Sequence, residues 1–266
     1  MQSIRLACFG DVVGKSGRAA LRRRLNDIRR ELDLSFVLVN GENSAGGLGI
    51  DPDSANEIFN AGANVITLGD HAFNRREVLG IFDRDRRVIR PFNYPPETPG
   101  FGWFKYALSP TLNIGVFTVL GTVFMGEGKV SCPFRAAKEV LSGPLLDCEI
   151  LLAEIHAEAT SEKSAFGWYL DGLVTLVFGT HTHVLTADER ILPKGTGFIT
   201  DIGMCGPSES VIGMDIDTAL HRFTSPLPRS HKVGRGDAII NGLVIEYDLS
   251  ANKLLSLSRI TESVKV

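Results

Sequence analysis

The sequence predicts an α/β fold in which parallel strands alternate with helices. The first third of the chain alternates short apolar runs, typical of buried strands, with amphipathic segments typical of helices. This β-α-β-α-β-α order implies parallel strands joined by right-handed crossovers. The chain has 266 residues, 44% of them hydrophobic, so it can bury a large core. We expect one domain over residues 1–266, because no linker, repeat or low-complexity tract divides the chain.

Three strand–helix units are expected in the first part of the chain. Leucine and isoleucine recur every three or four residues between positions 21 and 32, which is the pattern of an amphipathic helix capped by Ser16. Asp51 followed by Pro52 indicates another helix start, because proline fits the first helical turn. The expected strands are 4–9, 36–39 and 65–68, and the expected helices are 18–32, 51 to about 61, and 75–83.

The pattern of the chain changes near residue 191. Before this point strands and helices continue to alternate, whereas after it apolar runs indicate meandering strands, which we expect to be antiparallel. The stretches 90–102 and 224–236 contain prolines and no periodicity, so they are expected to be loops. The expected strands are 114–120, 150–155, 173–178, 198–199, 238–247 and 254–260, with helices at 135–141 and 161–169.

Charge and composition argue against several classes of protein. The net charge is −3 and the pI is about 6.1, which argues against holding long nucleic acid by charge but leaves a single nucleotide as substrate. The four cysteines form no CxxC pair, so neither a zinc ribbon nor a disulfide framework is expected. No apolar run reaches membrane length and no signal-peptide pattern is present, so we expect a soluble, cytoplasmic protein.

The stretch GTHTH at 179–183 indicates metal chemistry. It follows the expected strand 173–178, so His181 and His183 are expected at the carboxyl end of a strand, where ligands bind in open α/β sheets. In extended backbone the two imidazoles would point to the same side and would suit a transition metal. The alternative is a pair of loop histidines bonded to backbone or water, which the motif alone leaves open.

Residues that commonly bind metals follow five of the expected strands. Each has an ordinary alternative, such as a helix cap, a loop residue or a histidine without a ligand. However, parallel strands place their carboxyl ends on one edge of a sheet, so these residues would converge there. The candidates are Asp11; Glu42 and Asn43; Asp70 and His71; His156; and His181 and His183.

This mixture of ligands favours hydrolytic metal chemistry. Carboxylate, amide oxygen and imidazole without thiolate suit Mn²⁺, Fe²⁺, Zn²⁺ or Mg²⁺. There are more candidates than one ion needs, so we expect two ions with a bridging carboxylate, which would hold a hydroxide for in-line attack on phosphorus. Such a site needs no covalent nucleophile, and the sequence shows no strong Ser-His-Asp pattern.

The order of these motifs resembles that of the calcineurin-like metallophosphoesterases, and more closely that of their bacterial YmdB-type branch. The resemblance runs nearly from end to end. It rests on GDVVG at 10–14, NGEN at 40–43, RP at 90–91 with Asn93, HAEATSEK at 156–163, GWY at 167–169, the stretch 179–195 ending in ILPKG, TDIGM at 200–204 and GMD at 213–215.

The resemblance implies a four-layer α/β/β/α sandwich with mixed sheets. It also implies a metal-dependent phosphoric diester hydrolase that acts on a small phosphodiester, with cyclic nucleotides such as 2′,3′-cyclic AMP as expected substrates. Two divalent ions are implied, Fe or Mn in the first place and Mg or Zn as alternatives. A homo-oligomer is compatible with the resemblance, although no segment of the sequence identifies an interface.

The resemblance also implies a role for each candidate residue. Glu42 would bridge the two ions, and His71 would donate a proton to the leaving oxygen or stabilise the phosphate. Asn43 would be a further metal-site or phosphate-contact residue. The implied ligands are Asp11, Glu42 and His183 for one ion, and Glu42, Asp70, His156 and His181 for the other.

Two positions depart from the pattern of the branch. The usual Gly-Asn-His is replaced by GDH at 69–71, so Asp70 adds a third carboxylate to Asp11 and Glu42. This change is expected to alter metal preference or weaken the attraction of an anionic substrate, and to favour the imidazolium form of His71. The smaller departure is Glu154, where the branch tends to have aspartate.

Two rival functions are compatible with parts of the sequence. The stretch GDVVGKS at 10–16 is similar to a phosphate-binding P-loop, but it has three residues between its glycines instead of four, and Asp11 would repel phosphate. The second rival is a metal-binding signalling or RNA-associated scaffold with weak or no catalysis, an interpretation that the change at Asp70 keeps open.

Overall fold

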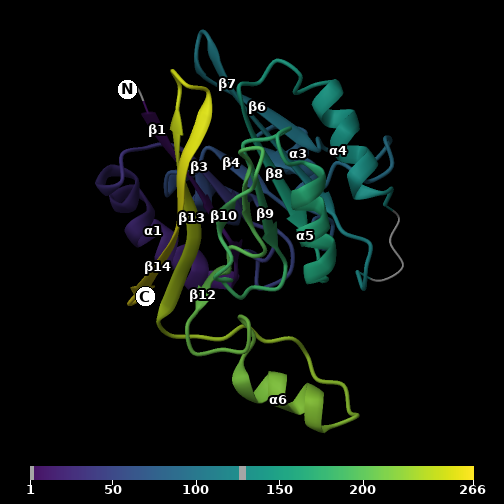
Figure 1. Cartoon of the computed structure of the whole chain (residues 1–266). Coiled ribbons are helices and arrows are strands. Elements are labelled where there is room, and N and C mark those ends of the chain that lie inside the picture. Colours follow the sequence, from purple (N-terminus) through teal and green to yellow (C-terminus); the bar gives the residue numbers. More distant parts are fainter. Residues whose placement is uncertain (1–2, 126–129) are drawn as a thin grey trace.

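The computed structural model describes residues 3–125 and 130–266, and it shows two β-sheets packed face to face between two layers of helices (Figure 1). One apolar cluster lies between the sheets and joins Leu6 and Phe36 of the first sheet to Val116 and Leu152 of the second. Two further clusters fill the space between each sheet and its helices. The predicted four-layer α/β/β/α sandwich is confirmed.

The first sheet has eight strands in the order β2-β12-β13-β1-β3-β4-β5, with β14 paired to β13. Strands β1, β3, β4 and β5 are parallel, whereas β13 runs antiparallel to β1 and β14, so the sheet is mixed. Its strands are β1 (Ser3–Phe9), β2 (Asp11–Val12), β3 (Leu34–Asn40), β4 (Val65–Thr67), β5 (Val88–Ile89), β12 (Met204–Pro207), β13 (Ala238–Asp248) and β14 (Lys253–Val264).

The second sheet has six strands in the order β10-β11-β9-β8-β7-β6. Strands β7, β8, β9 and β11 are parallel, and the edge strands β6 and β10 are antiparallel to their neighbours. Its strands are β6 (Trp103–Ser109), β7 (Leu112–Leu120), β8 (Ile150–His156), β9 (Leu176–Thr180), β10 (Arg190–Ile191) and β11 (Gly197–Ile199).

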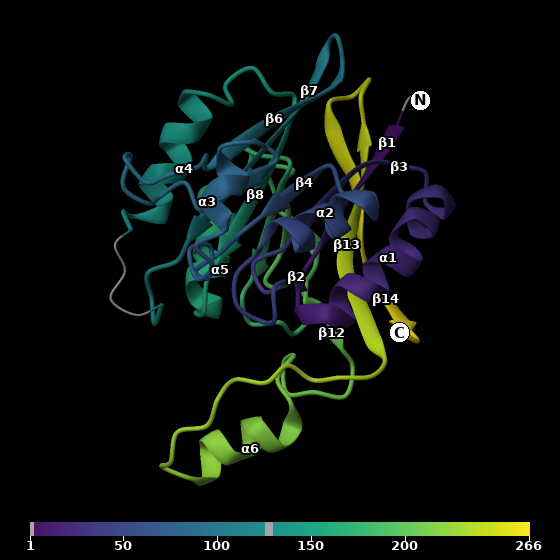
Figure 2. The same ribbon diagram turned by 180° about the vertical axis from the view of Figure 1, so that it is seen from behind.

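Helices cover the outer face of each sheet, as the two views from opposite sides show (Figures 1 and 2). Helix α1 buries Leu21, Leu25 and Ile28 against the first sheet, as its spacing predicts. The Asp51 side chain accepts a hydrogen bond from Ser54 N at 2.8 Å and so caps α2, as predicted. The helices are α1 (Gly14–Glu31), α2 (Pro52–Asn60), α3 (Val78–Phe82), α4 (Pro133–Ser142), α5 (Thr160–Tyr169) and α6 (Ile216–Thr224).

Several predicted boundaries and one predicted strand direction are wrong. Helix α1 begins at Gly14 and its cap position is Val13, so Ser16 lies inside the helix and does not cap it. Strand β11 is parallel to β9, because the chain crosses over to reach it, and it is antiparallel only to β10. The edge strand β6 and the helix α6 lie where no strand or helix was predicted.

Helix α6 lies on an arm, residues 208–237, that extends away from the sandwich (Figures 1 and 2). Its start has the same signal as α2, because Asp215 accepts a hydrogen bond from Thr218 N at 3.0 Å. Exposed apolar side chains such as Phe223, which is 85% exposed, obscure the pattern of a helix that packs on a core. The predicted loop 224–236 follows it without regular structure. No helix among the described residues is long and apolar enough to cross a membrane.

Candidate metal centre

Four of the predicted ligands form one compact group. Their ligand atoms all lie within 4.8 Å of one another. His156 Nε2 lies 3.1 Å from Glu42 Oε1, 2.9 Å from Asp70 Oδ1 and 3.1 Å from His181 Nδ1. We call these residues the first ligand group: Glu42, Asp70, His156 and His181.

Both sheets contribute to the first ligand group. Glu42 and Asp70 follow β3 and β4 of the first sheet, whereas His156 ends β8 and His181 follows β9 of the second sheet. The carboxyl ends of these parallel strands meet at one edge of the sandwich, as the sequence predicts. Gly69 lets the chain pass closely here, because a Cβ atom at this position would lie 2.3 Å from His156 Nε2 and 2.4 Å from Glu42 Oε2.

Three other predicted residues form a looser group beside the first. Asp11 Oδ1 lies 3.9 Å from His183 Nε2, and Asn43 Nδ2 lies 3.2 Å from the same nitrogen. Asn43 Nδ2 also donates to Glu42 Oε1 at 3.3 Å, so Glu42 stands between the two groups. We call Asp11, Asn43 and His183 the second ligand group.

His71 lies at the rim of the centre, with 28% of its side chain exposed. Its Nδ1 donates to Asn43 Oδ1 at 2.7 Å, and its backbone N–H donates to Glu42 Oε2 at 3.2 Å. The other ring nitrogen, Nε2, lies 3.7 Å from Asp70 Oδ2. His71 therefore contacts both groups and keeps a face toward solvent, where a substrate can reach it.

The two histidines of the GTHTH stretch reach the centre by a route that differs from the prediction. Strand β9 ends at Thr180, and His181 and His183 adopt positive φ angles of 90° and 63°. The expected strand alternation is therefore wrong, and a left-handed turn aims one imidazole at each group. Such a conformation costs about 1–3 kcal/mol for each residue that is not glycine, so the surrounding structure must hold it in place.

Hydrogen bonds on the outer side of His156 orient its ring. Thr180 Oγ1 donates to Glu154 Oε1 at 2.7 Å and so must accept from His156 Nδ1 at 2.8 Å. The lone pair of His156 Nε2 then points into the first ligand group. Burial raises the pKa of Glu154 to about 7, although Asn40 also donates to its Oε1.

The other two imidazoles are oriented in a similar way. His181 Nε2 lies 3.2 Å from Glu158 Oε2, a carboxylate that is half exposed. His183 Nδ1 donates to the backbone carbonyl of Ile212, at the base of the arm, at 2.8 Å. Because these contacts use the other nitrogen of each ring, His181 Nδ1 and His183 Nε2 are available to bind a metal. Sequence reasoning missed Glu158 and Ile212, although Glu158 lies only two residues after His156.

The charges of the centre favour a cation. Among the described residues, the ion pairs of Asp11, Glu42 and Asp70 are formed with histidines alone. Burial opposes a charged imidazole at His156, but Glu42 and Asp70 outweigh burial and raise the pKa of His156 well above its usual value. The pKa of Asp11 is raised as well, because the group is completely buried.

The donor set fits a divalent metal. Asp11 Oδ1 is buried and has no hydrogen-bond partner among the residues that the structure describes. When both imidazoles are neutral, His156 Nε2 and His181 Nδ1 face each other with lone pairs at 3.1 Å, an arrangement that a bound cation would relieve. Imidazole nitrogen with carboxylate oxygen is the set that Mn, Fe and Zn accept.

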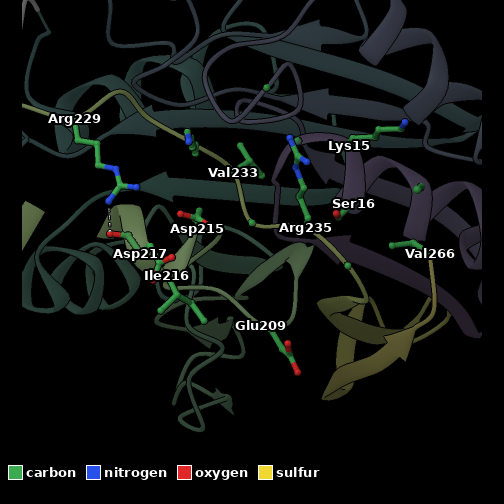
Figure 3. Close-up of a pocket in the computed structure, with 16 residues that line it drawn as sticks. Lys15, Ser16, Glu209, Asp215, Ile216, Asp217, Arg229, Val233, Arg235 and Val266 are labelled. Carbon is green, nitrogen blue, oxygen red and sulfur yellow. Dashed lines mark hydrogen bonds between the residues drawn. The ribbon is translucent and has the colours of Figure 1, made fainter. Parts of the chain in front are cut away.

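A separate cavity of about 1380 Å³ lies between the start of α1 and the arm (Figure 3). Lys15 and Ser16 of α1 line it together with residues of the arm such as Asp215 and Arg235. The predicted site residues are not part of its lining. Asp11, which the P-loop reading would place against phosphate, lies instead beside His183 in the second ligand group.

Comparison with known proteins agrees with this geometry. A family model described as YmdB-like protein matches residues 7–260. A 2′,3′-cyclic-nucleotide 2′-phosphodiesterase of Bacillus subtilis (strain 168) is 37% identical over 257 residues, which cover 97% of this chain and 96% of that protein. The relative's name supports the predicted class of enzyme, a hydrolase of phosphoric esters.

Solved structures show the same fold. The crystal structure of a novel phosphatase from Mycoplasma pneumoniae matches with a TM-score of 0.93 at 33% identity, over 100% of this chain and 95% of that one. The calcineurin-like phosphoesterase YfkN from Bacillus subtilis is only 9% identical and matches with a TM-score of 0.55 over 98% of this chain and 90% of its own, which shows a shared fold alone. The predicted resemblance is confirmed, and the chain belongs to the YmdB-like family.

Proposed function

We propose that this chain is a phosphodiesterase that hydrolyses cyclic nucleotides, 2′,3′-cyclic AMP among them, with the help of two divalent metal ions. The observation that carries the proposal is the first ligand group, in which two carboxylates and two imidazoles converge within 4.8 Å. The substrate class is supported by the name of the Bacillus subtilis relative.

In this proposal the first ligand group holds one ion, and the second ligand group together with Glu42 holds the other. Support comes from the position of Glu42, whose Oε1 lies 3.1 Å from His156 Nε2 and 3.3 Å from Asn43 Nδ2. When bound, such ions withdraw charge from a phosphoryl group and make an attacking water more acidic. We favour Fe or Mn over Mg or Zn, as the resemblance to the calcineurin-like metallophosphoesterases implies, since the donor set alone also accepts Zn.

His71 is the proposed catalytic residue. Its Nδ1 donates to Asn43, so the ring has a fixed direction, and its Nε2 faces the partly open rim beside Asp70. A proton held at Nε2 would go to the leaving oxygen as the bond to phosphorus breaks. Asn43 positions His71 and also lies close enough to the centre to contact a phosphate oxygen.

Both sheets supply ligands to the first ligand group, which supports the proposal that residues 1–266 work as one domain. Neither sheet alone carries the set, because Glu42 and Asp70 belong to the first sheet and His156 and His181 to the second. The cytoplasmic location and the homo-oligomer remain predictions.

The test is metal content together with hydrolysis of bis-p-nitrophenyl phosphate and 2′,3′-cyclic AMP, before and after chelation. We expect about two ions in each chain, activity that chelation removes, and recovery with Mn²⁺ or Fe²⁺. A matched control is His221→Ala, which changes a partly buried histidine of the arm outside both ligand groups. Bound metal without turnover would favour the scaffold, and a chain that binds no metal would contradict the proposal.

His71→Ala provides a second test that separates catalysis from metal binding. We expect kcat for 2′,3′-cyclic AMP to fall by about 10²–10⁴-fold, because its alkoxide leaving group needs a proton. Hydrolysis of bis-p-nitrophenyl phosphate should fall much less, since nitrophenolate leaves without one. An unchanged kcat on the cyclic nucleotide would show that His71 has another role.

A further inference from the structure

Lys163 and Asp201 form an ion pair that is buried behind the centre. Lys163 on α5 is 1% exposed, Asp201 is 0% exposed, and Lys163 Nζ lies 2.8 Å from Asp201 Oδ2. Burying two charges is unfavourable unless hydrogen bonds satisfy them, and well-packed apolar residues are often equally stable. A buried pair of this kind therefore calls for an explanation beyond the stability of the core.

The buried pair binds Thr182, which lies between His181 and His183. Asp201 Oδ2 accepts from Thr182 N at 3.2 Å and from Thr182 Oγ1 at 2.6 Å. Lys163 Nζ donates to the same hydroxyl at 3.0 Å. The hydroxyl thus donates to the carboxylate and accepts from the ammonium, so the three side chains form a closed triangle.

Each partner of the triangle is also anchored to the backbone around the motif. Asp201 Oδ1 accepts from Gly203 N at 2.8 Å. The alkyl stem of Lys163 packs on Gly179, where a Cβ atom would lie 2.8 Å from Lys163 Cδ and 1.8 Å from the backbone oxygen of Thr200. The ion pair therefore contacts the GTHTH stretch at its glycine, Gly179, and at its second threonine, Thr182.

The turn needs such support because both flanking histidines have left-handed backbone. His181 has φ 90° and His183 has φ 63°. Glu158 and the carbonyl of Ile212 bind the two rings, and the backbone N–H of His181 donates to Asp11 Oδ2 at 3.3 Å. Among the hydrogen bonds of the described residues, those of Thr182 are formed with Lys163 and Asp201.

We propose that Lys163 and Asp201 are positioning residues of the metal centre, which fix Thr182 and thereby aim His181 at the first ligand group and His183 at the second. This inference rests on the proposed function, because it assumes that both histidines bind metal. It predicts that a single change at Thr182 lowers the affinity for both ions, because the two histidines that the turn directs belong to different ligand groups.

The deciding experiment is calorimetric titration of the metal-free protein with Mn²⁺, together with its thermal unfolding. Thr182→Val keeps the shape of the side chain but removes both hydroxyl hydrogen bonds, and Thr182→Ser keeps them. We expect Thr182→Val to weaken both binding steps by about 10–100-fold, as is usual for residues that orient metal ligands. Thr182→Ser should restore binding to within about twofold, because it restores the hydroxyl.

Lys163→Met tests the ion pair itself, because it keeps an apolar stem over Gly179 and removes the ammonium. The matched control is Lys105→Met, which removes the lysine of a surface ion pair with Asp147. Neither residue of this pair belongs to a ligand group, so Mn²⁺ binding should stay unchanged. If Lys163→Met does not fold, the two variants of Thr182 still decide the question, since they leave the buried pair in place.

The outcomes distinguish failure of this inference from failure of the proposed function. A native protein that binds no Mn²⁺ would contradict the proposed function. A native protein that binds two ions, together with a folded Thr182→Val variant that binds them equally well, would overturn the positioning role alone. A lower unfolding temperature with unchanged Mn²⁺ affinity would likewise show that Lys163 and Asp201 only stabilise the core.

Discussion

The two ligand groups of the centre are built in different ways. In the first group, His156 Nε2 lies within 3.1 Å of Glu42, Asp70 and His181, and each of the four residues ends a strand or follows one within three residues. In the second group, Asp11 Oδ1 and His183 Nε2 are 3.9 Å apart, and His183 is oriented by a carbonyl at the base of the arm.

This difference indicates that the first ligand group is preformed, whereas the second closes only when an ion arrives. Contacts near 3 Å between donors mean that little movement is needed to bring them onto a metal. Asp11 and His183 lie further apart, and the buried Asp11 Oδ1 has no hydrogen-bond partner in the part of the chain that the structure describes. This pair must contract to bind an ion, which costs binding energy. We therefore expect the ion of the first group to be held more tightly.

The largest expected effect comes from the residue that the two groups share. Glu42→Gln should remove both ions and lower activity by more than the roughly 100-fold that outer residues of a metal site cause. Metal analysis of the purified variant beside kcat measurements will test this, with Glu139→Gln on the surface of α4 as control. Two ions still bound to Glu42→Gln would show that it does not bridge.

Single histidine variants test the difference between the groups directly. His181→Ala should remove the tightly held ion and leave a weak site, whereas His183→Ala should leave one ion bound with nearly native affinity. Titration with a chelator, followed by metal analysis, measures how many ions remain at each chelator concentration. If His183→Ala loses the tightly held ion instead, the assignment of the two groups is reversed.

A smaller effect is expected at Asp70, where the family resemblance predicts asparagine. Asp70→Asn keeps an oxygen near His156 Nε2 and removes one negative charge from the first ligand group. Activity with Mn²⁺ should change by less than about tenfold, which corresponds to about 1.4 kcal/mol in the barrier, and KM for an anionic substrate should fall. Asp147→Asn, on the surface, is the control. A large loss of activity would mean that the centre depends on the carboxylate of Asp70.

An effect of a different kind is expected at Glu154, the acid behind His156, and it appears in stability rather than in rate. The pKa of Glu154 is raised from 4.5 to about 7 by burial, so the folded protein keeps a proton there that the unfolded chain releases. Between pH of about 4.5 and 7 the folded state binds more protons, and its stability falls as pH rises through this range.

Glu154→Gln should remove this pH dependence, because glutamine cannot ionise. Urea unfolding of the metal-free proteins at pH 5 and pH 8 will show it. As the pH rises from about 4.5 to 7, the free energy of unfolding of the native protein should fall by on the order of 3 kcal/mol relative to that of the variant. If the free energy of unfolding changes with pH by the same amount in both proteins, Glu154 is already ionised in the folded state.

Much of the fold and of the centre follows from short-range patterns. The spacing of Leu21, Leu25 and Ile28 predicts α1, and Asp51 before Pro52 predicts the start of α2. The first ligand group could be anticipated because each of its members comes soon after a strand, and parallel strands bring their ends together. These signals work because periodicity and capping depend on neighbours within a few residues.

Other features could not be read in this way. Helix α6 was missed because its apolar side chains are exposed, and the direction of β11 was misjudged because no local signal shows which strand it joins. The left-handed turn at His181 and His183 was not predicted, because positive φ is uncommon for any residue other than glycine and no local pattern marks it here.

The motifs of the sequence predict the family, and the resemblance implies the four layers. Polar residues placed after strands predict the first ligand group, because each of these signals lies within a few residues. How tightly each ligand group is closed, and what holds the histidines in place, became visible only in the folded chain. Thr182 lies 19 residues after Lys163 and 19 residues before Asp201, and only the packing of the chain brings the three side chains together. Hydrogen bonds between residues this distant follow no periodic pattern in the sequence, so they cannot be predicted from it.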